Sequence, residues 1–144
     1  MNQNLYIKNQ SEEAKLIYTT QLLWAKINAQ LNFLFNSYDL NITKFNILMA
    51  IKHSSEGQAI EIEELKKDIL VCSSKIDTCI DELEKSAHIT RENNVLKVTQ
   101  ATSSLLDEIW VKYEESLKII TNGLKDEDKV ELRNKMLEWI INIK

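Results

Sequence analysis

The sequence predicts a mostly α-helical protein: a winged helix-turn-helix with long dimerisation helices at its N- and C-terminal ends and a short two-stranded wing. Its 144 residues include no proline and only two glycines, so little in the chain interrupts a helix. Apolar side chains recur at helical spacing along most of the chain, and over residues 88–99 they alternate with polar ones. One hydrophobic core suits this length, and we expect a single domain over residues 1–144.

Residues 11–37 are expected to form the first long helix, within a dimerisation segment over residues 11–38. Its apolar positions make one stripe and a second row beside it: Leu16, Leu23, Ile27, Leu31, Leu34 and Tyr38, then Ile17, Trp24 and Phe35. So wide an apolar face needs two neighbouring elements to bury it.

Two shorter helices are expected in tandem over residues 64–70 and 73–86. Their apolar residues lie at helical spacing: Leu65, Ile69 and Leu70 in the first, and Ile76, Cys79, Ile80 and Leu83 in the second. The break at residues 71–73 is so short that the two helices must cross tightly, as in a helix-turn-helix. Ser73 or Ser74 is placed to cap the second helix by accepting hydrogen bonds from its first free amides.

A short wing is expected to follow this pair of helices. The segments HITRE and VLKVT alternate apolar with polar residues on either side of Asn93 and Asn94. Asparagine tolerates the positive φ that a two-residue hairpin turn requires. The winged helix-turn-helix is therefore expected over residues 42–99.

The C-terminal part is expected to form a second dimerisation segment over residues 102–143. A helix over 102–122 carries a heptad-like seam, and a last helix from Asp126 begins with acidic residues that suit the positive end of its dipole. Gly123 is expected to close the first of these helices in a left-handed conformation. The apolar positions are Leu106, Trp110, Tyr113, Leu117, Ile120 and Leu124, then Leu132, Met136, Trp139, Ile140 and Ile143.

These long helices carry more apolar surface than the small winged region can cover. We therefore expect a second copy of the chain to bury part of it in a two-fold homodimer. The alternative is a monomeric helical bundle in which the same residues form an ordinary core.

The chain resembles the MarR (multiple antibiotic resistance regulator) family of transcription factors in four segments. They are LNITKFNIL at 40–48, ELKKDILVCSSKIDTCIDELEKSAHITR at 64–91, VLKVTQ at 95–100 and LKDEDKVELRNKMLEWI at 124–140. The order and spacing of the segments agree with the family over nearly the whole chain, whereas the Asp-x-Arg pattern of the family's wing is absent. The resemblance implies a DNA-binding transcriptional regulator, with a dimer interface made by the first and last helices.

The resemblance also implies where DNA would bind. The helix at about 73–86 would enter the major groove, with Ser74, Lys75, Asp77 and Thr78 facing outward near its N-terminal end. Arg91 matches an arginine at the base of the family's wing and is expected to contact phosphate or to brace the wing. Lys97 is expected at a flanking phosphate. The two-residue turn is too short for the minor-groove contact that the family makes there.

The charge of the winged region argues against DNA binding. Residues 42–99 contain eight basic and ten acidic side chains, whereas DNA-binding domains use a basic face to neutralise phosphate. The alternative function is a winged-helix protein that binds another protein, such as a regulator, in place of DNA.

Other functions find little support in the sequence. No nucleophile lies at a recognisable spacing from a base and no glycine-rich loop is present, so we expect neither an enzyme nor a cofactor. Cys72, Cys79, His53 and His88 lack the spacing of metal ligands. Both cysteines are expected to be reduced and buried, the alternative being that Cys72 senses oxidants.

The chain shows no signal sequence and no run of eighteen apolar residues, which predicts a soluble, cytoplasmic protein. The resemblance alone suggests a small-molecule effector between the dimerisation helices and the winged region. Trp24, Trp110 and Tyr113 would line such a cleft, or else belong to the core.

Overall fold

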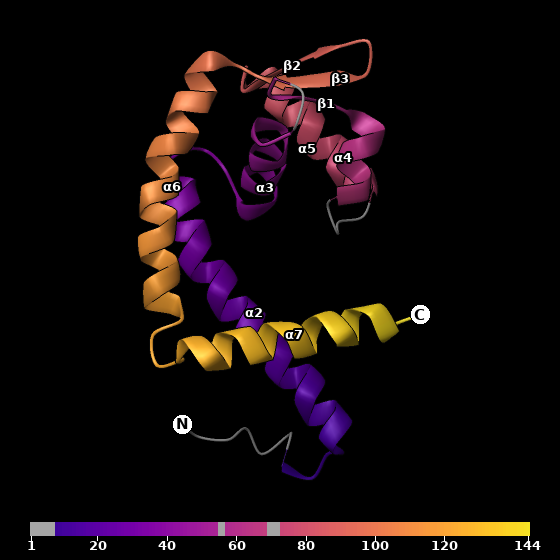
Figure 1. The fold of residues 1–144 in the computed structure, drawn as a ribbon, viewed down its shortest axis with the longest axis vertical. Helices are drawn as coiled ribbons and strands as arrows, with labels where there is room; N and C mark the ends of the chain where they lie inside the picture. Colours follow the sequence, from indigo (N-terminus) through magenta and orange to yellow (C-terminus); the bar gives the residue numbers. More distant parts are fainter. Residues whose placement is uncertain (1–7, 55–56, 69–72) are drawn as a thin grey trace.

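The computed structural model describes residues 8–54, 57–68 and 73–144, and it confirms the mostly α winged helix-turn-helix (Figure 1). In chain order the elements are α2 (Glu12–Asn36), α3 (Ile42–Lys52), β1 (Ala59–Glu61), α4 (Ile62–Asp68), α5 (Ser73–Lys85), β2 (Ile89–Glu92), β3 (Val95–Val98), α6 (Gln100–Ile120) and α7 (Asp126–Asn142). Figure 1 shows the winged region at one end of α2 and α6, with α7 turning away from α6 at the other end.

The helix ends follow local capping chemistry. The Ser11 side chain accepts a hydrogen bond from the Ala14 amide and caps α2, so this helix begins one residue after the predicted position. Asn41 caps α3 in the same way through the Lys44 amide. Thr99 caps α6, which therefore begins two residues before the predicted start at Thr102.

The C-terminal helices agree with the sequence in their order and differ slightly in their ends. Helix α6 ends at Ile120, and Gly123 adopts the expected positive φ of 98° in the turn that follows. Helix α7 begins at Asp126 with three acidic residues in its first turn, as expected from the helix dipole.

The wing hairpin is confirmed in detail. Strands β2 and β3 pair antiparallel from Ile89 opposite Val98 to Glu92 opposite Val95. Asn93 and Asn94 have φ values of 50° and 64°, the two left-handed residues that a type I′ turn needs.

A third strand, which the sequence did not predict, extends the sheet beyond the two-stranded wing. Strand β1 pairs antiparallel with β3, and Ala59 lies opposite Lys97, which gives the order β1-β3-β2. Three residues are too few to show an alternating pattern in sequence. The chain enters β1 through Gly57 and Gln58, which both have a φ of 64°.

The helix-turn-helix is built from α4 and α5 on the apolar surface of α3. Helix α4 begins two residues before the predicted start and buries Leu65. Residues 69–72 lie outside the part of the chain that the structure describes, and they include Ile69, Leu70 and Cys72. Of the predicted turn at 71–73, only Ser73 is described, and α5 begins there.

The hydrophobic core lies in the winged region and the adjoining halves of α2 and α6. Its centre is α3, which buries four apolar side chains, and an aromatic cluster joins it to the long helices. In this cluster the Phe45 ring lies 4.7 Å from the Phe35 ring and 5.0 Å from the Tyr113 ring, measured between centroids. In this core α4 and α5 pack on α3, and α3 packs on α2.

The N-terminal half of α2 and all of α7 remain outside this core. Helix α7 buries no residue, and the Trp24 side chain on α2 is 53% exposed. The same holds for Leu16, Ile17, Leu23, Leu132, Met136, Ile140 and Ile143, which are all exposed. A single chain therefore does not bury these residues in a helical-bundle core, which was the alternative to a dimer. Within the described residues, no helix has the length and apolar character needed to cross a membrane.

Candidate nucleic-acid interface

Helix α5 separates its apolar and polar residues cleanly. Ile76, Cys79, Ile80 and Leu83 are buried against the core. The predicted outward residues Ser74, Lys75, Asp77 and Thr78 are all exposed, which confirms their position on the solvent-facing side of the helix. This exposed face is the candidate nucleic-acid interface.

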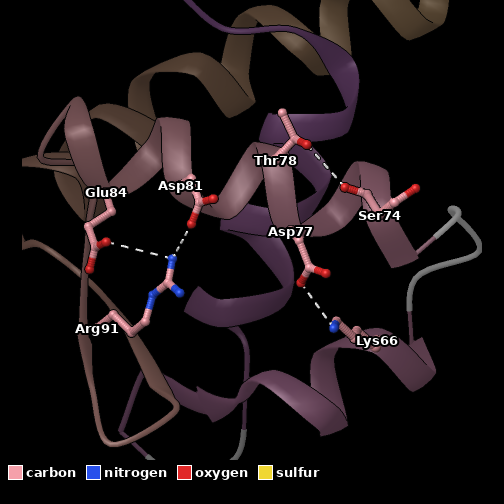
Figure 2. A network of polar contacts seen from close by, with 7 residues as sticks. All are labelled: Lys66, Ser74, Asp77, Thr78, Asp81, Glu84 and Arg91. Atoms are coloured by element: carbon pink, nitrogen blue, oxygen red, sulfur yellow. Dashed lines mark hydrogen bonds and ion pairs between the residues drawn. The ribbon is translucent and has the colours of Figure 1, made fainter.

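The Thr78 hydroxyl on this face is oriented by the helix itself. It donates a hydrogen bond to the backbone carbonyl of Ser74, with the two oxygens 3.1 Å apart (Figure 2). This bond uses the only proton of the Thr78 hydroxyl, so its oxygen remains available as an acceptor.

Asp77 forms an ion pair across the helix-turn-helix. Its carboxylate Oδ1 lies 3.0 Å from the Lys66 ammonium on α4 (Figure 2), and the Asp77 side chain is still 56% exposed. The hydrogen bond to Asp77 is the main cause of a raised pKa at Lys66. Sequence analysis missed Lys66 as a member of the site, because its distance to Asp77 depends on how the two helices cross.

Arg91 braces the wing against α5. Its guanidinium donates a hydrogen bond to the Asp81 carboxylate at 2.7 Å and lies 3.6 Å from the Glu84 carboxylate (Figure 2). Asp81 and Glu84 are three residues apart and therefore share one side of the helix. Arg91 thus joins strand β2 of the wing to α5 through these two carboxylates.

Lys75 and Lys97 are the predicted site cations that remain unpaired. Both are exposed, and neither forms an ion pair with any residue that the structure describes. Lys75 lies on α5, whereas Lys97 lies on β3 opposite Thr90 and Ala59. The predicted site cations thus divide into Arg91, which pairs with carboxylates of α5, and Lys75 and Lys97, which form no ion pair among the described residues.

Cations from three neighbouring elements neutralise the acidic face of α5. The helix carries four carboxylates, and each pairs with a cation: Asp77 with Lys66, Asp81 and Glu84 with Arg91, and Glu82 with Lys44 at 2.8 Å. Together with Lys75 and Lys85, the helix and its partners hold five positive and four negative side chains. Each carboxylate of α5 therefore has a cation beside it, which the count along the sequence does not reveal.

A polar junction fixes the winged region to α6. His88 Nδ1 lies 3.1 Å from the Thr102 hydroxyl, and the Thr99 hydroxyl lies 2.9 Å from the same oxygen. Burial lowers the pKa of His88, while nearby Asp39 acts in the opposite direction. On α3, Lys52 forms a further ion pair with Asp107 of α6.

The remaining candidate residues separate into core and surface. Cys79 is buried, and burial raises the pKa of its thiol, as expected for an apolar rather than a reactive cysteine. Tyr113 packs in the aromatic cluster, while Trp110 stacks on Tyr113 with 5.4 Å between ring centroids and is partly exposed. Among the described residues, no group of three His, Cys, Asp or Glu side chains is placed to hold a metal ion.

Comparison by sequence finds neither a matching protein-family model nor a matching curated protein. Comparison by structure finds MarR-family regulators. AbsC, a MarR-family transcriptional regulator from Streptomyces coelicolor, is 19% identical with a TM-score of 0.78, and the match covers 92% of this chain and 94% of that one. The organohalide-sensing regulator RdhR-CbdbA1625, in its ligand-free form, reaches a TM-score of 0.86 at 16% identity, covering 96% and 84% of the two chains.

A third match was solved with nucleic acid bound. A cysteine-to-serine mutant of MarR from E. coli, complexed with operator DNA, has a TM-score of 0.78 at 17% identity, and the match covers 94% of this chain and 98% of that one. The chain therefore has the fold of MarR-family regulators, as its resemblance implied.

Proposed function

We propose that the protein is a transcriptional regulator that binds double-stranded DNA as a homodimer and places α5 in the major groove. The observation that carries this proposal is the exposed N-terminal half of α5, where Ser74, Lys75 and Thr78 face solvent on a helix-turn-helix. Arg91 keeps the wing beside this helix, and Lys97 would meet a flanking phosphate. The similarity in fold to an operator-bound MarR protein supports this use of the surface.

The homodimer follows from the exposed apolar residues of α2 and α7. An apolar surface of this extent is typical of an interface between chains. A dimer would also present two copies of α5, as a two-fold DNA site requires.

A small-molecule effector is a further part of this proposal. Trp24 on α2 and Trp110 on α6 are exposed aromatic side chains that an effector could contact, and both helices adjoin the winged region at one end (Figure 1). RdhR-CbdbA1625 is described as organohalide-sensing, which supports ligand response on this fold.

A salt titration tests the DNA-binding proposal. Fluorescence anisotropy of a labelled random-sequence duplex should show binding at about 50 mM salt that weakens as salt rises, because binding releases counterions. The slope of log affinity against log salt should be shallow, since few cations of the site are unpaired. Absence of binding at about 50 mM salt would overturn the proposal.

That negative result would support a second candidate function, a winged-helix protein that binds another protein. The pairing of Lys44, Lys66 and Arg91 with carboxylates favours it, because these cations are already engaged within the chain.

A further inference from the structure

We propose that α5 reads cytosine amino groups in the major groove with the side-chain oxygens of Asp77 and Asp81. This inference rests on the proposed DNA-binding function and gives it a base preference. It concerns which chemical groups of DNA the helix selects, and its failure is separable from a failure to bind DNA.

The two carboxylates occupy one edge of the exposed face. Asp77 and Asp81 are one helical turn apart, and their side chains are 56% and 61% exposed. Lys66 and Arg91 each engage the Oδ1 atom of one carboxylate from a neighbouring element (Figure 2). A carboxylate has two oxygens and about four acceptor positions, so a single cation leaves capacity for a second donor.

The ion pairs of α5 reduce the repulsion that its carboxylates would meet at the phosphate backbone of DNA. An unpaired carboxylate would be repelled by the phosphate backbone, whereas all four carboxylates of α5 have a cation within 4.0 Å. The cations also hold the side chains in place, since each joins α5 to another element of the winged region. Asp77 and Asp81 are thus acceptors held in ion pairs that have little net charge.

Thr78 adds a third acceptor to the exposed face, on the side toward Ser74 (Figure 2). Its hydroxyl proton is donated to the Ser74 carbonyl, so its oxygen faces solvent as an acceptor. The first three turns of α5 therefore present acceptors at Asp77, Thr78 and Asp81, and the Lys75 donor lies at the opposite edge of the exposed face from Asp77.

The donors that such a face meets in the major groove are the amino groups of cytosine and adenine. The adenine amino group lies beside N7, an acceptor that repels a carboxylate, whereas the cytosine amino group lies beside a C–H. Aspartate accordingly favours cytosine. Asparagine favours adenine, because its amide pairs with N6 and N7 together.

The test is selection of bound sequences from a random duplex library by the wild-type dimer and by variants. The wild type should enrich a cytosine-containing position in each half-site. Asp77→Asn or Asp81→Asn should shift at least one such position to adenine, with a change in relative affinity of about fivefold or more. Glu82→Gln is the matched control: it removes a carboxylate from the same helix, on the side paired with Lys44, and should leave the selected sequence unchanged.

A second measurement uses the wild-type protein alone, so it does not depend on the folding of any variant. In the selected duplex, 2-pyrimidinone replaces cytosine at the enriched position and removes only the amino group. Affinity should fall about fivefold or more. Selected sequences that are the same for all four proteins, or undiminished binding to the 2-pyrimidinone duplex, would overturn the inference and leave the proposed DNA binding intact. A wild type that binds no duplex would overturn both.

Discussion

Arg91 is the residue that joins the wing to α5, the helix of the proposed DNA-binding surface. Its guanidinium lies between Asp81 and Glu84 and joins the wing to α5. A planar guanidinium suits this position, because it can donate to two carboxylates at once. Arg91 thereby links the wing to α5.

We expect Arg91→Ala to lower the free energy of unfolding by about 0.5–1 kcal/mol, the scale of a partly exposed ion pair. It should also weaken DNA binding, because Asp81 and Glu84 lose their cation and the wing loses its brace. Lys75→Ala is the matched control: it should leave stability unchanged and flatten the salt slope of DNA binding by about one unit per subunit. Urea unfolding and the salt titration measure the two effects. Equal stability of the two variants would contradict the brace.

The candidate site was partly predictable at this scale. The outward positions of Ser74, Lys75, Asp77 and Thr78 follow from helical periodicity alone, since the buried positions of α5 are plain in sequence. The ion pairs to Lys66 and Arg91 were not predictable, because they join residues on different elements whose distances depend on packing. The count of net charge along the chain therefore gave too acidic a picture of the exposed face.

At the scale of elements, the junction of β2 with α6 carries a titratable group. His88 ends the turn after α5 and meets Thr102 in the first turn of α6, where Thr99 caps the helix. Asp39 and Lys44 are the charged groups that act on it from the α2–α3 turn and from α3. Its environment favours the neutral imidazole.

This junction predicts a pH-dependent stability. Because burial lowers the pKa of His88 in the folded protein, the unfolded chain binds the proton more readily, and stability falls as pH drops below about 6.5. His88→Gln removes the titrating group, so its melting temperature should fall less than that of the wild type between about pH 7.5 and about pH 5.5. Thermal unfolding by circular dichroism at both pH values measures the difference. An equal fall in both proteins would show that His88 does not contribute.

The elements themselves were largely predictable from periodicity and caps. Long apolar stripes predicted α2, α6 and α7 to within two residues, and the Asn93–Asn94 turn predicted the hairpin. Strand β1 was not predicted, because three residues are too few to show an alternating pattern. Its pairing with β3 also depends on contacts between residues far apart in sequence.

At the scale of the whole molecule, burial divides the chain into a packed end and an open end. The winged region and the adjoining halves of α2 and α6 share one core. Helix α7 buries nothing, and Phe33 on α2 is 85% exposed, whereas Leu31 and Phe35 on the same helix are buried. Periodicity predicted that these helices have wide apolar faces, yet sequence alone left open whether the same chain covers them. The structure removes that alternative for a single chain.

We therefore expect light scattering at micromolar concentration to give about twice the chain mass of 16.8 kDa. Ile140→Glu should shift the mass toward one chain, because it places a charge on the apolar face of α7 without touching the core of its own chain. It should also weaken DNA binding, since two linked copies of α5 bind more tightly than one. Lys135→Gln makes the same one-unit change in net charge on a polar position of α7 and should leave the mass unchanged. A wild-type mass of one chain at every concentration would contradict the dimer. The apolar faces of α2 and α7 would then have to be buried by a different protein. Any DNA binding would depend on a single copy of α5, without the second copy that a two-fold dimer supplies.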